Sequence, residues 1–564
     1  MPESSVRKRH DADTQIRMRR GAKTERQDMS IAGTEHQTHR PSAPACAMVI
    51  FGANGDLTSR LIVPSLYNLC RTRALPDNFF LIGISRTAFT TAEWIDGLRG
   101  MMKAHTTSIA SEFSGGTVDD TAWTWLSSRM RYMRGDFTKS ETHQQLRALL
   151  EEAGQQRGTG GNALFYLATA DRYFAAIVEE LGKAGLTDEN KNADGVPARW
   201  RRVVIEKPFG HDVASAHDLN RLLSRTLTEA QTFRIDHFLG KNAVQSILAL
   251  RFANGMFESI WNRDRIDHVQ ITVSETVGVE DRAEFYEATG ALRDMVPSHI
   301  CSLIAMMALE PPVGFDASSI RDKMRDVFAA MPAVSPEHAV RGQYDSGTVS
   351  GRPAKAYRAE PKVDPASNTE TFVAMRFEID NWRWAGVPFY IRTGKHMAVR
   401  STEIAICFRK APYAAFQEAP VDSLRPNWLV LRITPDEGIS LQFDVKRRGP
   451  AMALAPVTMD FHYQDWFQSE PNVGYEVLLY DVMTGDQTLF IRADIIQQTW
   501  RLVQPVLDAW STEKPVFPDY ASGGQGPAAA DTLLARDGNR AWRPLPQPPV
   551  PQPPVPQPPV PKPA

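Results

Sequence analysis

The stretch Ala47-Met-Val-Ile-Phe51, followed directly by Gly52-Ala-Asn-Gly-Asp-Leu57, decides the fold. The five apolar residues predict a short buried strand, and the glycines predict a turn. After the turn, Leu57, Leu61, Leu66 and Leu69 recur on one face of a predicted helix. A strand, a glycine turn and a helix N-terminus together form a cradle for the pyrophosphate of a dinucleotide, because glycine lets backbone N–H groups approach the anion closely. We therefore expect a coenzyme to contact Gly52, Asn54, Gly55, Asp56 and Leu57.

The spacing of this turn departs from the standard dinucleotide-binding pattern. It is Gly-x-x-Gly-x-x-Thr, and Thr58 stands at the position where a small residue usually packs. The next predicted strand, Phe79–Ile84, ends in Ser85-Arg86-Thr87, where an NAD enzyme usually carries an acidic residue for the ribose hydroxyls. Because an arginine suits a 2′-phosphate, Arg86 predicts NADP as the cofactor.

Two more apolar segments, Ala163–Ala168 and Arg202–Ile205, continue the alternation of strands and helices. This order predicts an α/β protein with an N-terminal, Rossmann-like, doubly wound domain. Alternating segments such as Asp267–Val273 and Thr371–Glu378 predict a mostly antiparallel sheet later in the chain. We expect an NADP-binding domain over 46–235 and a larger α+β domain over 236–543 for substrate binding and oligomerisation.

Composition narrows the class of protein. The chain has 564 residues and a formal net charge of -2, so no global charge favours nucleic acid or an anionic membrane as a partner. Its four cysteines have no metal-ligand or disulfide-framework spacing, and we expect no metal. No segment has the length of a membrane span, and the N-terminus lacks the apolar region of a secretory signal, so we expect a cytoplasmic protein.

Both ends of the chain differ from the rest. Residues 1–45 are polar and rich in arginine, which predicts a disordered arm. Residues 546–560 repeat Pro-Gln-Pro-Pro-Val three times, which predicts a proline-rich disordered tail over 544–564.

A series of motifs carries a family resemblance. Glu206-Lys-Pro-Phe-Gly210 is followed by Phe233-Arg-Ile-Asp-His-Phe-Leu-Gly-Lys241, then Arg293-Asp-Met-Val-Pro-Ser-His299 and Val387-Pro-Phe-Tyr-Ile-Arg-Thr-Gly-Lys395. With the glycine turn in front, this series closely resembles the glucose-6-phosphate dehydrogenase family over roughly 46–543. The resemblance implies oxidation of glucose 6-phosphate at C1 to the lactone, with NADP as cofactor, by a homodimer or homotetramer.

The resemblance also implies roles for single residues. His299 matches the catalytic base and Asp236 the carboxylate paired with it. Lys207 matches the lysine between coenzyme and substrate, and Tyr166 matches a coenzyme contact. The positions that match substrate-binding residues are His237 and Lys241 for the phosphate, Glu275 and Asp294 for the sugar hydroxyls, and Lys395 and Arg400, which close the site.

Chemistry and helix geometry add to these assignments. Removing a hydroxyl proton needs a base with a pKa near neutrality, which histidine supplies. Asp294 lies five residues before His299, about 140° around a helix, and would therefore point away from it. His237 and Lys241, four residues apart, would share a helix face and reach one phosphate.

Two departures from the family pattern affect the site. Phe238 replaces a usual tyrosine, which removes a hydroxyl from the phosphate site. Pro297 replaces a usual glutamine, and a proline inside a helix can kink it and turn His299 away. Three alternatives stay open: a dehydrogenase for another hexose phosphate, a non-catalytic sugar-phosphate and NADP-binding homologue, and an interaction scaffold that uses the tail.

Overall fold

The computed structural model of this chain describes residues 41–107, 117–190, 198–413, 424–450, 452–467 and 474–545. The predicted N-terminal arm and proline-rich tail thus lie, except for a few residues, outside the described residues. Among the helices in the described ranges, none is long and apolar enough to cross a membrane.

Six parallel strands form the first sheet, in the order β3-β2-β1-β4-β5-β6. Their bounds are β1 Cys46–Phe51, β2 Phe79–Ser85, β3 Met130–Arg134, β4 Ala163–Leu167, β5 Arg201–Ile205 and β6 Thr232–Arg234. Every residue of β1 and β4 is buried, since helices cover both faces of the sheet. The doubly wound N-terminal sheet expected from the sequence is confirmed.

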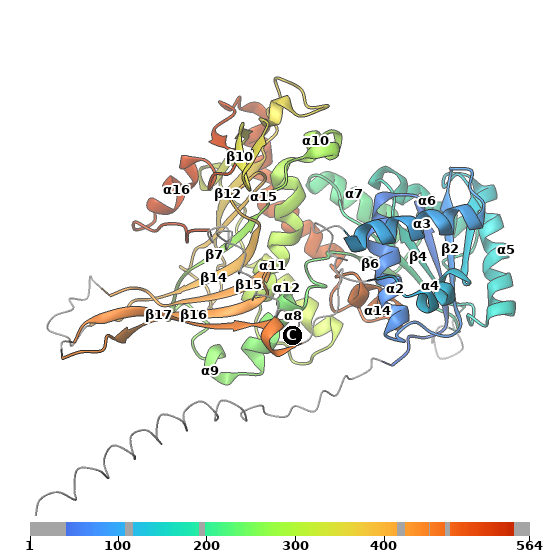
Figure 1. Ribbon diagram of the computed structural model, residues 1–564, viewed down its shortest axis with the longest axis horizontal. Helices are drawn as coiled ribbons and strands as arrows, with labels where there is room; N and C mark the ends of the chain where they lie inside the picture. Colours follow the sequence, from blue (N-terminus) through green and yellow to red (C-terminus); the bar gives the residue numbers. More distant parts are fainter. Residues whose placement is uncertain are drawn as a thin grey trace, which may run out of the picture.

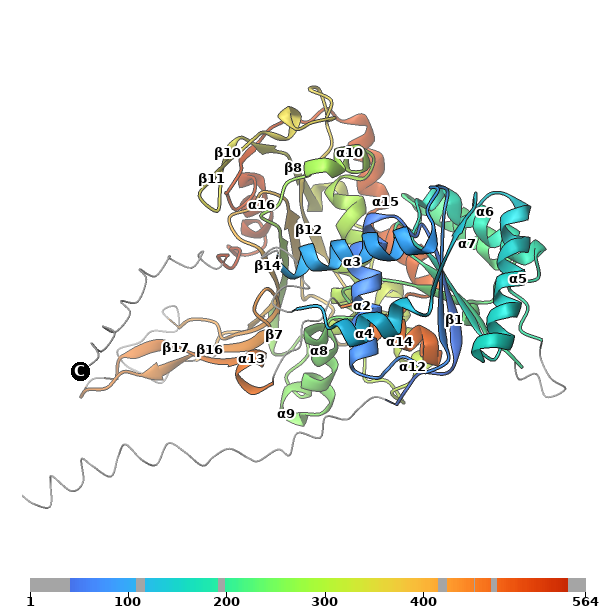
Figure 2. The same cartoon turned by 45° about the vertical axis from the view of Figure 1, so that its right-hand side comes forward.

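The helices of this part lie in two layers. Their bounds are α2 Val63–Arg71, α3 Thr91–Thr107, α4 Asp120–Ser127, α5 Ser140–Arg157, α6 Phe174–Lys183 and α7 Val213–Ser224. Figure 2 shows α2, α3 and α4 on one side of the sheet and α5, α6 and α7 on the other. A π-helical turn, η2 (Thr58–Ile62), joins the glycine turn to α2.

The second sheet has eight strands in the order β17-β16-β15-β14-β7-β13-β12-β8. Their bounds are β7 Ile266–Ser274, β8 Ala339–Gly342, β12 Phe372–Phe377, β13 Phe389–Gly394, β14 Ser401–Phe408, β15 Trp428–Thr434, β16 Gly438–Lys446 and β17 Leu454–His462. All neighbouring pairs are antiparallel except β7 and β13. The expectation of a mostly antiparallel second sheet is confirmed. In Figures 1 and 2, β16 and β17 extend away from the body of the molecule.

The remaining helices belong to the second part of the chain. Their bounds are α8 Asn242–Phe252, α9 Gly255–Glu258, α10 Ala283–Met295, α11 Cys301–Ala308, α12 Ala317–Ala329, α13 Tyr463–Trp466, α14 Glu476–Thr484, α15 Ala493–Thr512 and α16 Ala528–Ala535. A second π-helical turn, η6 (Val296–Ile300), joins α10 to α11. Figure 1 shows α10 and α11 on the side of the second sheet that faces the first.

Late segments of the chain return to the first sheet. Arg202 of β5 donates from Nη1 to the carbonyl oxygens of Val482 and Met483 in α14, at 2.6 and 2.7 Å. The indole Nε1 of Trp500 in α15 donates to the carbonyl oxygen of Phe209 at 3.1 Å. These bonds fix how the two parts of the molecule face each other, and the candidate site lies where they meet.

Candidate active site

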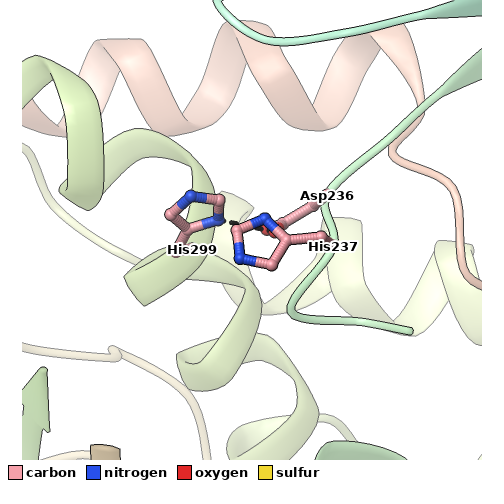
Figure 3. Close-up of side chains that lie close together, drawn as sticks. All are labelled: Asp236, His237 and His299. Atoms are coloured by element: carbon pink, nitrogen blue, oxygen red, sulfur yellow. Dashed lines mark hydrogen bonds and ion pairs between the residues drawn. The ribbon is translucent and has the colours of Figure 1, made fainter. Parts of the chain in front are cut away.

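The two central residues of the site, Asp236 and His299, come from different parts of the chain. One follows a strand of the first sheet, and the other comes after β7 of the second sheet. Asp236 and His237 follow β6, and His299 lies in η6 (Figure 3). The Nδ1 atom of His299 is 2.6 Å from Oδ1 of Asp236. Both residues are almost fully buried, with 2% and 1% of their surface exposed. The structure therefore brings together the two residues that the family resemblance paired.

The ionisation of this pair follows from its surroundings. Burial tends to raise the pKa of Asp236, but the charge and hydrogen bond of His299, together with Ser302, hold it well below its usual range. Burial lowers the pKa of His299; Asp236 acts against this shift and the cation of Lys207 adds to it. A neutral imidazole that donates Nδ1–H to an ionised carboxylate leaves Nε2 as a basic nitrogen.

Lys207 occupies the other side of the imidazole. Its Nζ lies 2.7 Å from Nε2 of His299 and 2.8 Å from Oδ1 of Asp294. An ammonium group can only donate, so Nε2 accepts. Asp294 thus contacts the base through Lys207 and not directly, in keeping with the expectation that Asp236 is the paired carboxylate.

The helix that carries His299 is irregular. α10 contains a break at Gly290, whose φ of 63° and ψ of 179° are not helical. After the break, Glu370 Oε1 accepts from the N–H of Leu292 at 2.9 Å. Pro297 lies in η6, which continues directly from α10; the π-helical turn accommodates the proline, and His299 still reaches Asp236.

The expected helix over His237 and Lys241 is wrong. Residues 237–240 form turns, and Lys241 is the residue before α8. The two side chains meet around Phe238 instead: the ring of His237 is 5.0 Å from that of Phe238, and Lys241 Nζ is 4.5 Å from its centroid. The turn forms because the N–H of Phe238 donates to Asp236 Oδ1 at 3.0 Å, which diverts the chain from a helix.

Phe238 also contacts the base. Its ring is stacked on that of His299, with centroids 4.5 Å apart and planes at 19°. Phe238, which lacks the hydroxyl of the family's usual tyrosine, therefore packs against the imidazole of His299 and helps to fix its plane.

The second sheet supplies another charged pair. Lys395 follows β13, Glu275 follows β7, and these parallel strands end together. Lys395 Nζ donates to Glu275 Oε2 at 2.6 Å, and its charge also acts on Asp294. Arg400 is exposed and directly precedes β14.

The expected coenzyme residues lie at the carboxyl edge of the first sheet. Gly52 has a φ of 96°, and a Cβ there would lie 2.1 Å from the carbonyl oxygen of Ala168, so only glycine fits. The helix begins at Asp56, directly after the turn, and the first N–H groups of a helix have no partner within it. These residues fit a pyrophosphate. Asn54 donates to Thr87 beside the exposed Arg86, which links the turn to the end of β2.

Tyr166 has a different environment from the rest of this set. It is fully buried in β4, and its hydroxyl donates to the carboxylate of Glu206, the neighbour of Lys207. Burial raises the pKa of Glu206 to about 7. Within the described residues, Tyr166 therefore supports the segment that carries Lys207.

Comparison with known proteins identifies the family of this chain. Residues 49–246 match the family model described as "Glucose-6-phosphate dehydrogenase, NAD binding domain", and residues 248–543 match "Glucose-6-phosphate dehydrogenase, C-terminal domain". The chain belongs to the glucose-6-phosphate dehydrogenase family. Its first part is accordingly a domain that binds a nicotinamide dinucleotide.

Individual members of this family are similar along most of the chain. The Glucose-6-phosphate 1-dehydrogenase of Chlamydia muridarum is 41% identical over 505 residues, covering 89% of this chain and 97% of that protein. The enzyme of Bacillus subtilis is 39% identical over 503 residues, covering 88% and 98%.

Two solved structures of the family share the fold. The crystal structure of the Mycobacterium avium enzyme has a TM-score of 0.74 and 38% identity, covering 90% of this chain and all of that one. A glucose-6-phosphate dehydrogenase in complex with its substrate glucose-6-phosphate has a TM-score of 0.79 and 28% identity, covering 89% and 99%.

A cavity of about 350 Å³ adjoins the family's signature residues. Lys207 and Pro208, which are joined by a cis peptide bond, line it from the first domain, and Asp294 and Pro297 line it from the second. Asp171, just beyond the end of β4, also lines the cavity. A ligand in this cavity would contact both domains.

Sequence reasoning named Arg86 but missed a second cation near the coenzyme turn, Arg172. Arg172 and Tyr173 lie in η3 (Asp171–Tyr173), after β4. The guanidinium carbons of Arg86 and Arg172 lie 5.9 and 5.2 Å from the ring centroid of Tyr173. Nothing in the sequence indicates this meeting, because β2 and β4 are brought together only by the order of strands in the sheet.

Asp236, His237 and His299 could also be considered as metal ligands, since their ligand atoms lie within 4.8 Å of one another. However, hydrogen-bond donors of the protein already occupy both oxygens of Asp236. We therefore interpret the group as an acid–base site, and a reaction without metal stays a prediction.

Proposed function

We propose that this chain oxidises D-glucose 6-phosphate at C1 to 6-phospho-D-glucono-1,5-lactone with NADP. The observation that carries the proposal is the buried His299, bonded through Nδ1 to Asp236 and facing Lys207 with Nε2. A base so oriented between two domains, in a chain of this family, suits removal of a hydroxyl proton beside a bound coenzyme.

Substrate binding uses charges on both sides of the base. We assign the phosphate to His237 and Lys241, which lie beside Phe238, with Arg400 as a further cation. Lys395, Glu275 and Asp294 are assigned to the sugar hydroxyls and the closing of the site. The ion pairs Lys395–Glu275 and Lys207–Asp294 support this division, because they present donors and acceptors suited to hydroxyl groups.

The proton path follows from the hydrogen bonds. The C1 hydroxyl takes the place of Lys207 Nζ at Nε2 of His299, and Nε2 removes its proton as the C–O double bond forms. Asp236 stabilises the resulting imidazolium through Nδ1. Oxidised NADP, when bound, accepts the hydride that leaves C1. Lys207 stays close enough to bind the oxygen.

Selectivity for NADP is assigned to Arg86 and Arg172. Two guanidinium groups beside one tyrosine ring can each bind a 2′-phosphate with a pair of hydrogen bonds. The uncharged 2′-hydroxyl of NAD gains less from them. A hydrogen bond with Arg172 and the charges of Arg172 and Arg86 lower the pKa of the Tyr173 hydroxyl, in keeping with a positively charged environment.

A spectrophotometric assay at 340 nm tests the proposal. The purified chain is given NADP or NAD with glucose 6-phosphate, other hexose phosphates and unphosphorylated glucose. We expect rapid NADPH formation with glucose 6-phosphate and little with glucose. Absence of NADPH with every sugar phosphate would contradict an enzymatic role, and a higher kcat/KM for another hexose phosphate would change the substrate.

Three further parts of the proposal are carried over from the sequence. They are a division of the chain at 235/236 into coenzyme and substrate domains, a homodimer or homotetramer built through the eight-stranded sheet, and a cytoplasmic location. Analytical ultracentrifugation of the full chain tests the assembly, since a monomer at working concentrations would contradict it.

A further inference from the structure

A serine in the apolar helix α11 contacts the Asp236 carboxylate of the site. Ser302 lies in α11, where all eight residues are buried, and only 3% of its surface is exposed. Its Oγ donates to Oδ2 of Asp236 at 2.6 Å. A buried hydroxyl in a helix commonly bonds the carbonyl four residues earlier, but Ser302 reaches across to another segment.

With the bond from Ser302, both oxygens of the Asp236 carboxylate accept hydrogen bonds. Oδ1 of Asp236 accepts from His299 Nδ1 and from the N–H of Phe238, at 2.6 and 3.0 Å. Among the described residues, Ser302 is the hydrogen-bond donor on Oδ2. His299 and Ser302 are three residues apart across the junction of η6 and α11, so one helix face presents both to Asp236.

We propose that Ser302 is a positioning residue that fixes the orientation of the Asp236 carboxylate and, through it, of His299. The inference rests on the proposed function, in which Asp236 supports the base. Without the hydroxyl, the carboxylate is free to rotate about its last bond, and Oδ2 has lost its donor. His299 then samples orientations in which Nε2 does not face the substrate.

Loss of the Ser302 hydroxyl also changes the pKa of His299 in a defined direction. A carboxylate with one donor fewer is more basic and stabilises the imidazolium more strongly, so the pKa of His299 rises. The charged and titratable groups that face His299 are Asp236, His237, Lys207 and Asp294, and a change at Ser302 leaves all four in place.

The test compares three substitutions of one residue. For Ser302→Ala we expect kcat to fall about tenfold with little change in KM for either substrate, and the acid limb of the pH–rate profile to move to higher pH. Ser302→Thr keeps the hydroxyl and should restore both kcat and the profile. Ser302→Cys, with a weak donor of similar size, should give an intermediate result and carries the test if Ser302→Ala does not fold.

A matched control separates positioning from the loss of a buried hydroxyl. Ser65 is a fully buried serine in α2, outside the residues assigned to the site, and its hydroxyl has no hydrogen-bond partner among the described residues. Ser65→Ala should leave kcat and the pH profile unchanged.

The outcomes distinguish this inference from the proposed function. An inactive parent chain would overturn the proposed function. An active parent with unchanged kcat and pH profile in Ser302→Ala, or in Ser302→Cys if that variant carries the test, would overturn only the role of Ser302. An equal loss in the alanine and threonine variants would do the same, since it would indicate a packing effect.

Discussion

At the scale of single residues, the site depends on three hydrogen-bonded groups in a line: Asp236, His299 and Lys207. The carboxylate fixes the tautomer of the imidazole, and the ammonium group occupies the nitrogen that a substrate hydroxyl needs. We therefore expect different effects from replacing the base, His299, and from replacing the cation, Lys207.

Replacing the base tests the role of His299 itself. His299→Asn keeps a polar side chain but has no basic nitrogen, so kcat should fall at least ~100-fold while binding of glucose 6-phosphate is kept. Steady-state kinetics and a binding titration measure the two effects. His217→Asn, which changes an exposed histidine, is the control. Turnover near that of the parent would remove His299 from the mechanism.

Replacing the cation tests its contact with His299. Lys207 lowers the pKa of His299, so its removal in Lys207→Met should raise that pKa. Because the base works only when deprotonated, the acid limb of the pH dependence should move to higher pH. NMR titration of His299 in the free protein measures the shift without turnover. A pKa that stays the same or falls would contradict the predicted influence of Lys207.

At the scale of elements, the irregular helix from α10 to α11 positions Asp294, His299 and Ser302. The helix breaks at Gly290 and begins again where Glu370 accepts a hydrogen bond from the N–H of Leu292. The π-helical turn η6 then accommodates Pro297. A regular helix over the same residues would carry Asp294 and His299 on different faces and would need a donor that Pro297 lacks.

A side chain at the break should disturb the site. In Gly290→Ala, the new Cβ would lie 2.3 Å from Glu370 Oε1, at a φ that L residues rarely adopt. We expect a loss of stability of about 1 to 3 kcal/mol and a lower kcat, since Asp294 and His299 follow the break. Denaturant unfolding and kinetics measure both.

The control for this variant is Gly97→Ala in α3, where an added Cβ meets no atom within 4 Å. It should be neutral or stabilising, because alanine favours a helix over glycine. If Gly290→Ala behaves like Gly97→Ala, the break is not needed for the site.

At the scale of the whole molecule, the site depends on how the two domains face each other. Residues late in the chain, in α14 and α15, pack on the first sheet through Arg202 and Trp500. The cavity beside Lys207 is lined from both sides of this junction, so loosening the junction should weaken the binding of both ligands.

Arg202 offers a direct test of the junction. Arg202→Ala removes two charge-assisted bonds to α14 carbonyls, which should cost about 2 kcal/mol of stability and raise KM for both substrates. Arg147→Ala, which removes an exposed ion pair with Glu151, should cost less than about 0.5 kcal/mol. Equal effects of the two variants in unfolding experiments would show that the junction does not depend on Arg202.

Strands with strong local signals could be predicted closely. The predicted strands Phe79–Ile84 and Ala163–Ala168 differ from β2 and β4 by one residue each. The edge strands β3 and β6 were not predicted, because β3 has only five residues, two of them arginines, and β6 has three residues. At an edge, pairing with a neighbour stabilises a strand that its own sequence specifies weakly.

The sequence by itself determined the doubly wound sheet, the glycine turn and the family, because these depend on local periodicity and on motifs in order. Through the family resemblance it also paired Asp236 with His299, because each lies in a contiguous motif, Phe233–Lys241 and Arg293–His299. Only the tertiary structure decided the turn at 237–240, the link from Lys207 to His299, and the meetings of Ser302 with Asp236 and of Arg172 with Arg86. These contacts join residues from different elements, and their geometry is set by the packing of both domains rather than by any local pattern.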